Sequence, residues 1–108
     1  MVTDLPADIA IEPIFVIEAT YAPDAAATRP AHRPEHVSRL AALRDAGVVI
    51  AAGAFADLSG SLILVRARDE AVVRDLVASD VYTRSGVWAH ARIRPFGLVR
   101  RAAELAGR

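Results

Sequence analysis

The chain has 108 residues and carries thirteen basic and thirteen acidic side chains, so its formal net charge is zero. This length corresponds to one domain, and we expect residues 1–108 to form it. The charge balance argues against a nucleic-acid partner, because such proteins present a basic face. The hydrophobic share of 54% is enough for a packed core and excludes a disordered chain. Cysteine is absent, which excludes disulfides and thiolate chemistry.

Membrane and export signals are also missing from the sequence. No apolar run approaches the roughly 18 residues of a membrane span, and no basic segment followed by an apolar stretch indicates a signal peptide. We therefore expect a cytoplasmic protein with no membrane partner. All basic residues are arginine, so Schiff-base and lysine general-base mechanisms are excluded.

The N-terminal part of the chain predicts a leader and a strand. Residues 1–13 form an irregular leader in which Pro6 and Pro13 act as breakers. Residues 14–21 are rich in β-branched and aromatic side chains, which is typical of a strand. Two further prolines indicate that residues 22–33 form a loop.

A helix is predicted to begin at Pro34, because proline suits the first helical position. It is predicted to end at Gly47. Apolar side chains follow at helical spacing, with charged side chains between them on the expected outer face. The charged residues of that face are Arg39, Arg44 and Asp45.

The remaining segments alternate strands, turns and helices. Asp69 can cap the second helix, whose apolar stripe ends before Ser79 and Asp80. Pro95 is expected to close the last strand. The predicted elements in chain order are a strand over 48–55, a hairpin loop over 57–61, a strand over 62–67, a helix over 70–78, a strand over 87–94 and a short terminal helix over 98–106.

The order βαββαβ predicts an α+β, ferredoxin-like fold, with a four-stranded antiparallel sheet and two helices on one face. The first three predicted strands are apolar on both faces, whereas a sheet with one wet face alternates apolar with polar residues. In the first strand Phe15, Ile17 and Ala19 alternate with Ile14 and Val16, and residues 62–65 of the third are continuously apolar. The second face therefore needs a cover. We expect a second copy in a homodimer; the alternative is that the terminal segments fold back over it.

Several short motifs occur together and in order. Arg33-Pro34-Glu35-His36 opens the first helix and is followed by Leu40 and Leu43; Asp80-Val81-Tyr82 precedes Gly86-Val87-Trp88; and Arg94-Pro95-Phe96 ends the sheet. This pattern resembles the YCII-related (YciI-like) domain family over residues 14–97. One departure is visible, because the family usually has Gly-Pro after the second strand and this chain has Gly53-Ala54.

The resemblance implies a dimeric α+β barrel with a His–Asp dyad associated with catalysis. It also implies similarity to small isomerases and to dehydrochlorinases that act on aromatic breakdown products. Most members have no assigned substrate, so the resemblance points to a site more than to a reaction.

The candidate catalytic residues are His36, Asp80 and Asp57. At about the third helical position, His36 would feel the positive end of the helix dipole, which favours a neutral, proton-accepting ring. In a βαββαβ sheet the start of the first helix, the hairpin with Asp57 and the loop with Asp80 meet at one edge. Asp80 is the preferred partner of His36, since the family pattern includes it.

Arg33 and Tyr82 are the candidate substrate-binding residues. Arginine can bind a carboxylate or a phenolate oxygen. Each candidate also has a plain structural interpretation. These are His36 as a helix-start histidine without a role, Asp80 as a polar residue after a helix, Asp57 as a turn former, Tyr82 as a packing aromatic and Arg33 as a solvated charge.

His32-Arg33-Pro34-Glu35-His36 formally matches H-x-x-E-H, a zinc-hydrolase motif. If Pro34 begins the helix, His32 lies in the preceding loop, and the two histidines do not share a helical face. We therefore expect no metal and no other cofactor.

The leading functional hypothesis is an enzyme of lyase or isomerase type, acting on a small cyclic or aromatic molecule with His36 as general acid/base. The competing hypothesis is a non-catalytic dimeric module that binds a small ligand or a regulatory partner. Convergence of His36, a carboxylate and Arg33 in one pocket would favour the enzyme, and their dispersal would favour the module.

Overall fold

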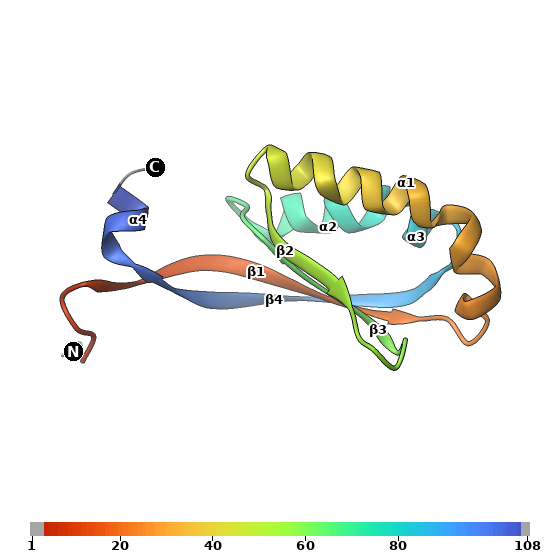
Figure 1. Ribbon diagram of the computed structural model, residues 1–108, viewed down its shortest axis with the longest axis horizontal. Coiled ribbons are helices and arrows are strands. Elements are labelled where there is room, and N and C mark those ends of the chain that lie inside the picture. The colour runs from red at the N-terminus through yellow and green to blue at the C-terminus, as the bar shows by residue number, and fades with distance from the viewer. Residues whose placement is uncertain (1–3, 107–108) are drawn as a thin grey trace.

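A computed structural model describes residues 4–106 of the protein. The elements in chain order are β1 (Ile9–Tyr21), α1 (Ala25–Asp45), β2 (Val49–Ala54), β3 (Gly60–Val65), α2 (Glu70–Ser79), α3 (Val81–Arg84), β4 (Trp88–Arg101) and α4 (Ala102–Ala106). The strands form one antiparallel sheet in the order β2-β3-β1-β4. Helices α1 and α2 lie on the same face of this sheet, as Figure 1 shows. The predicted ferredoxin-like α+β fold is confirmed.

The hydrophobic core lies between the sheet and its helices. Every second residue of β1 enters it, beginning with Ile17 and Ala19, and Ile63 and Val65 of β3 lie beside them. Helix α2 contributes Val73, which is fully buried. Helix α1 contributes little, because Ala25 and His36 are its only buried residues. The core is therefore sealed on the α2 side, whereas the space beneath α1 is less completely filled.

Helix α1 begins at Ala25, so the prediction of a loop over residues 22–33 and a helix starting at Pro34 is wrong. Pro30 and Pro34 both lie inside the helix, where each removes a backbone donor and crowds the preceding turn. The N-terminal part of α1 bends relative to the rest (Figure 1), as helices do at proline. Alanines at the start of the helix favour this conformation locally.

Strands β1 and β4 are longer than the sequence predicts. Their outer halves pair with each other from Ile9↔Arg101 to Pro13↔Gly97, so residues 9–13 belong to a strand and not to a leader. Pro13 is tolerated because β3 pairs with β1 only from Phe15 onward, which leaves no partner for the missing N–H. Pro95 lies in β4, an edge strand, and does not end it.

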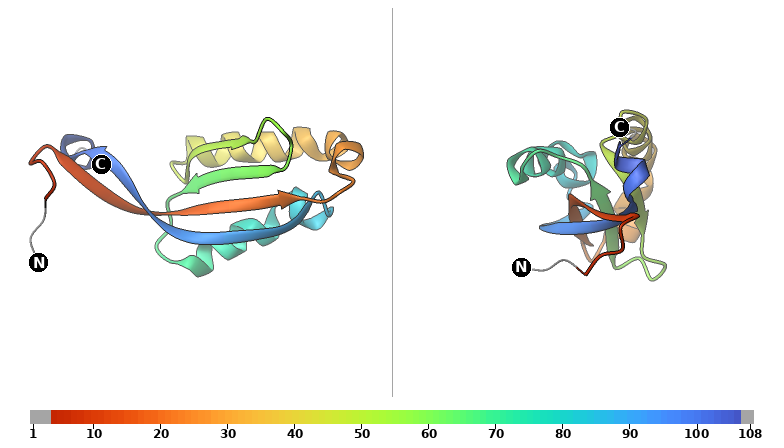
Figure 2. Two further views of the ribbon diagram at one scale, coloured as in Figure 1. Left: turned by 90° about the horizontal axis from the view of Figure 1, so that it is seen from below. Right: turned by 90° about the vertical axis from the view of Figure 1, so that its left-hand side faces the viewer.

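These outer halves form a two-stranded ribbon that extends away from the body of the protein, with α4 (residues 102–106 in place of the predicted 98–106) at its end (Figure 2). The molecule is accordingly elongated, with extents of 50 × 26 × 26 Å. Because the terminal strands run outward, they do not fold back over the open face of the sheet.

Two predicted helix signals are present in the structure. Asp69 caps α2, since its side chain accepts a hydrogen bond from the backbone N–H of Val72 at 3.1 Å. Gly47 follows the end of α1 with φ +80°, a conformation that favours glycine. Between residues 4 and 106, none of the helices combines the length and the hydropathy that crossing a membrane requires.

Candidate functional site

The carboxylate of Asp80 is held at the junction of α2 and α3. Asp80 ends α2 and caps α3, where its Oδ1 accepts the backbone N–H of Tyr82 at 2.9 Å. This local cap fixes the side chain before any distant residue reaches it. The side chain is only 2% exposed, so the ionised form depends on partners within the protein.

Two side chains of α1 supply those partners. His36 Nδ1 lies 2.8 Å from Asp80 Oδ1, and Arg39 Nη1 donates to Asp80 Oδ2 at 3.0 Å. Arg39 is held in turn by the carbonyl of Leu76 and the hydroxyl of Ser79. The predicted contact between His36 and Asp80 is therefore present, although 44 residues separate them. Arg39, predicted on the outer face of the helix, faces Asp80.

The electrostatics of the pair define the state of the imidazole. Burial alone raises the pKa of Asp80, but the hydrogen bonds from His36 and Tyr82 and the nearby cationic groups together hold that pKa below its ordinary value. An ionised carboxylate only accepts hydrogen bonds, so Nδ1 of His36 carries a proton. When the ring is neutral, Nε2 is then the nitrogen with a free lone pair.

The orientation of His36 rests on packing as well. Its ring stacks on Tyr82 at 3.8 Å between centroids with an interplanar angle of 10°, and it meets Trp88 edge-on at 5.3 Å. This packing corrects the predicted role of the helix dipole. His36 lies near the middle of α1, beyond the first turn in which the dipole acts, and Asp80 and the aromatic rings determine its environment.

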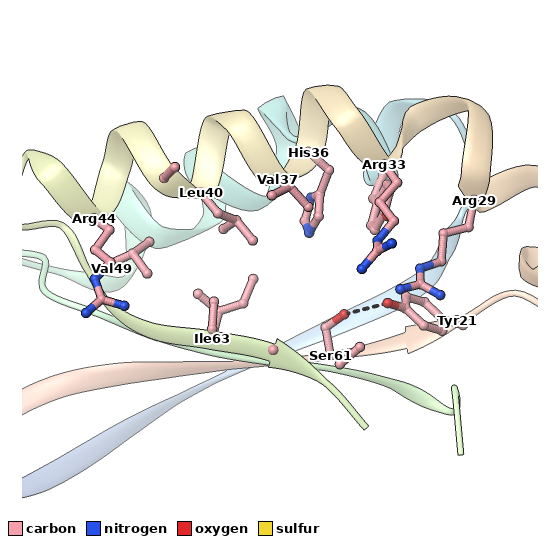
Figure 3. A pocket seen from close by; sticks show the side chains of 15 residues that line it. Tyr21, Arg29, Arg33, His36, Val37, Leu40, Arg44, Val49, Ser61 and Ile63 are labelled. Carbon is pink, nitrogen blue, oxygen red and sulfur yellow. Dashed lines mark hydrogen bonds between the residues drawn. The ribbon is translucent and has the colours of Figure 1, made fainter. Parts of the chain in front are cut away.

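A cavity of about 290 Å³ lies between α1 and the strands β2 and β3. His36, Arg33 and Tyr82 all line it, so the predicted catalytic histidine and both predicted substrate-binding residues converge. In Figure 3 the side chains of His36 and Arg33 point from α1 toward the sheet. The volume is close to the lower end of the range for small-molecule sites, which begins near 300 Å³.

Other lining residues were missed by the sequence analysis. Arg29 lay in the supposed loop and Arg44 on the supposed outer face, yet both line the cavity. The floor carries two hydroxyl groups, because Ser61 donates to the Tyr21 hydroxyl at 3.1 Å (Figure 3). The spacing of Arg29 and Arg33, one helical turn apart, would have revealed their shared face once both prolines were accepted inside the helix.

Asp57 does not take part in this site. It is exposed in the β2–β3 hairpin, where its side chain accepts the backbone N–H of Ser59 at 3.0 Å. Hydrogen bonding from the side chain of Ser59, and then from its backbone, lowers the pKa of Asp57. It neither bonds to His36 nor lines the cavity. The predicted gathering of three titratable groups thus holds for His36 and Asp80 only, and Asp57 has the turn-forming role that was its alternative interpretation.

The H-x-x-E-H motif has a different setting from the predicted one. Both histidines lie in α1, one turn apart, so the reasoning that placed His32 in a loop is wrong. However, Nδ1 of His36 is bonded to Asp80, and within residues 4–106 no group of three or more histidine, aspartate or glutamate side chains could hold a metal. The absence of a metal or other cofactor stays a prediction.

The family model of the YCII-related domain matches residues 14–97. The chain belongs to the YCII-related domain family. Gly53 and Ala54, which stand where the family usually has Gly-Pro, line the cavity wall.

A solved structure shares the fold. It is 5-chloro-2-hydroxyhydroquinone dehydrochlorinase (TftG) from Burkholderia phenoliruptrix AC1100, in complex with 2,5-dihydroxybenzoquinone. The two chains are 20% identical with a TM-score of 0.69, over 77% of this chain and 92% of the other. A comparison with curated protein sequences gave no match.

Proposed function

We propose that this protein is a small cofactor-independent enzyme of lyase or isomerase type that acts on a small cyclic or aromatic molecule. The observation that carries the proposal is the state of His36. Its ring lines the cavity, Nδ1 is fixed on the Asp80 carboxylate, and Nε2 has no protein partner among the described residues. A positioned imidazole of this kind is a general acid/base.

The proton transfer follows from these contacts. Nε2 accepts a proton from a C–H or O–H group of the substrate, and the resulting imidazolium is stabilised by the Asp80 carboxylate at Nδ1. In a lyase, the electron pair of the broken C–H bond forms a double bond as a leaving group departs with its own pair from the neighbouring carbon. In an isomerase, the proton returns to a different atom. Arg33 and Tyr82 orient the substrate beside the ring.

Two further findings support a small cyclic or aromatic substrate. The aromatic rings of Tyr21, His36 and Tyr82 line the cavity, and side chains of this kind pack well against a ring. TftG, which shares the fold, is a dehydrochlorinase of a hydroquinone.

The test measures proton transfer directly. The protein is incubated in D₂O with hydroxylated aromatic and cyclic lactone compounds, including 5-chloro-2-hydroxyhydroquinone, while NMR follows deuterium incorporation and an electrode follows chloride release. For a compound that turns over, His36→Gln is expected to lower kcat by about 10²–10⁴-fold. His90→Gln is the control, because His90 is exposed on β4.

Two results would contradict the proposal. Turnover by His36→Gln at the rate of the wild-type protein would remove His36 from the chemistry. Compounds that bind in the cavity and protect the protein against unfolding, with no exchange and no product across the panel, would favour the non-catalytic module.

We also propose that the protein is a homodimer. No helix covers the face of the sheet opposite α1 and α2 in the single chain (Figure 1), and this face carries half-buried Leu62 and Leu64. Phe55 is 49% exposed beside them. Apolar residues in such a row mark an interaction surface, and a second copy can cover it symmetrically.

Light scattering at micromolar concentration is expected to give twice the chain mass, and Leu64→Glu is expected to shift it toward the monomer. Leu105→Glu, in the distant α4, is the control for an added charge. A wild-type protein that is monomeric at this concentration would refute the dimer.

A further inference from the structure

The arginines of this chain differ in whether a carboxylate pairs with them. Most of them pair with a carboxylate, including Arg39 with Asp80 and Arg84 with Glu35. By contrast, no carboxylate pairs with any arginine that lines the cavity, within the part of the chain that the structure describes, and no aspartate or glutamate lines it. These cavity arginines are Arg29, Arg33 and Arg44.

Arg29 is the clearest case of an incomplete interaction. Its Nε is buried and has no hydrogen-bond partner, and its guanidinium lies over the ring of Tyr21, 5.5 Å from the centroid. The guanidinium also acts on the Tyr82 hydroxyl, although burial dominates and raises the pKa of Tyr82. A buried donor without an acceptor lowers the stability of the folded protein. The guanidinium of Arg29 can therefore bind an anionic acceptor in the cavity.

Two of these cations and His36 share one end of the cavity. Arg29 and Arg33 are one helical turn apart on α1 and their side chains point to the same side as His36, toward Tyr21 and Ser61 on the sheet (Figure 3). Toward the other end the lining is mainly apolar, with Leu40, Val49 and Ile63, and Arg44 lies beside Val49 there (Figure 3). The cavity thus joins a cationic end to an apolar section.

We propose that the natural ligand of this cavity is an organic anion whose carboxylate or phenolate oxygens bind Arg29 and Arg33, with its apolar body against Leu40, Val49 and Ile63. The anionic group then lies beside Nε2 of His36, so the charge selects the substrate and places it for proton transfer. This inference deepens the proposed function, on which it rests for the identity of the cavity as the substrate site. Arginine is suited to this task because its planar fork can bind two oxygens at once.

The test compares two probes of equal shape and different charge. Benzoate and benzamide are titrated separately by calorimetry into the wild-type protein and into Arg29→Gln, Arg33→Gln and Arg74→Gln. The last variant is the control, since Arg74 is exposed on α2 and pairs with Glu70. Inorganic phosphate serves as an anion without an apolar body.

Wild-type protein is expected to bind benzoate at least tenfold more tightly than benzamide or phosphate. Arg29→Gln and Arg33→Gln are each expected to weaken benzoate binding by about 10–100-fold, while Arg74→Gln leaves it within twofold. Without ligand, the two cavity variants are expected to melt at the wild-type temperature or above it, because they relieve repulsion between neighbouring cations.

Equal affinity for benzoate and benzamide, equal losses in the cavity and control variants, or no benzoate binding at millimolar concentration would each overturn the inference. Phosphate binding as tight as benzoate would overturn the role of the apolar section. If only the proposed function is wrong, the results differ. The wild-type protein and His36→Gln both still bind benzoate more tightly than benzamide, but no compound tested for turnover reacts.

Discussion

Replacing Asp80 with asparagine tests the centre of the site with almost no change in shape. The carboxylate accepts three hydrogen bonds, from the backbone N–H of Tyr82 at 2.9 Å, from His36 at 2.8 Å and from Arg39 at 3.0 Å. Asparagine has one acceptor oxygen and presents an NH₂ group on the other side. With its oxygen at the Oδ1 position it keeps the bonds from Tyr82 and His36 and faces Arg39 with a donor; in the flipped orientation it faces Tyr82 and His36 with a donor.

The expected loss of stability follows from these contacts. Hydrogen bonds to a charged group contribute about 1.5–3 kcal/mol each, and Asp80→Asn removes one or two of them. Removal of a buried charge offsets part of this loss, so we expect the free energy of unfolding to fall by about 2–3 kcal/mol. For a domain of this size the Tm is then lower by roughly 8–15 °C.

The lowered pKa of Asp80 determines how the stability difference between wild type and Asp80→Asn changes with pH. The pKa of Asp80 in the folded protein lies below 3.8, so the carboxylate contributes stability that is fully present above that value and is lost as the pH falls through the folded pKa. The stability gap between wild type and Asp80→Asn is therefore widest at neutral pH and narrows below about pH 4.

Urea unfolding followed by circular dichroism between pH 3 and pH 7 measures both quantities. Asp75→Asn, an exposed carboxylate on α2, is the matched control and is expected to change the free energy of unfolding by less than about 0.5 kcal/mol. A gap below that size at neutral pH, or a gap that stays constant down to pH 3, would refute the reasoning.

Three further predictions concern neighbouring positions. Arg39→Gln is expected to lower the free energy of unfolding by about 1–2 kcal/mol in urea unfolding, whereas equal losses in Arg39→Gln and Arg74→Gln would contradict the role of Arg39 at Asp80. Asp57→Asn is expected to leave benzoate affinity unchanged in calorimetry, because Asp57 lies outside the cavity. Gly60→Ala is expected to destabilise the protein by about 1–3 kcal/mol in thermal unfolding, since its Cβ would lie 2.1 Å from the carbonyl oxygen of Ala19; an unchanged Tm would show that the strands can separate there.

Local patterns in the sequence were sufficient for most of the fold. Apolar periodicity, the Asp69 cap and Gly47 gave the order of the elements, and that order gave the topology. Proline was the weak point, because each proline was interpreted as a boundary. Pro30 lies inside a helix, and Pro13 and Pro95 lie in strands with a free edge. Whether a missing N–H matters depends on which backbone group faces it, and that information is tertiary.

The sequence predicts the contacts of the site that depend on the order and direction of the elements. It does not predict those that depend on which side of α1 a residue faces. Strand and helix directions were enough to bring Asp80 to His36. A helix that starts at Pro34 has His36 in its first turn, where the helix dipole acts, and it leaves Arg29 outside the helix. Because α1 starts at Ala25, neither statement holds. Arg39 was assigned to solvent because a charged residue between apolar ones usually faces outward. Its position three residues after His36 places both on one side of the helix, where a buried carboxylate is available.

The distribution of charge links the stability of this protein to its proposed chemistry. At Asp80 the protein supplies both the buried anion and its cations, so the group is satisfied in the folded chain and holds one nitrogen of His36. On the other side of the same histidine, Arg29 and Arg33 supply cations with no carboxylate among the described residues. The imidazole therefore lies between a completed charge cluster and an incomplete one. An anionic ligand would complete the second cluster as it reaches Nε2, so binding and placement for proton transfer become the same event.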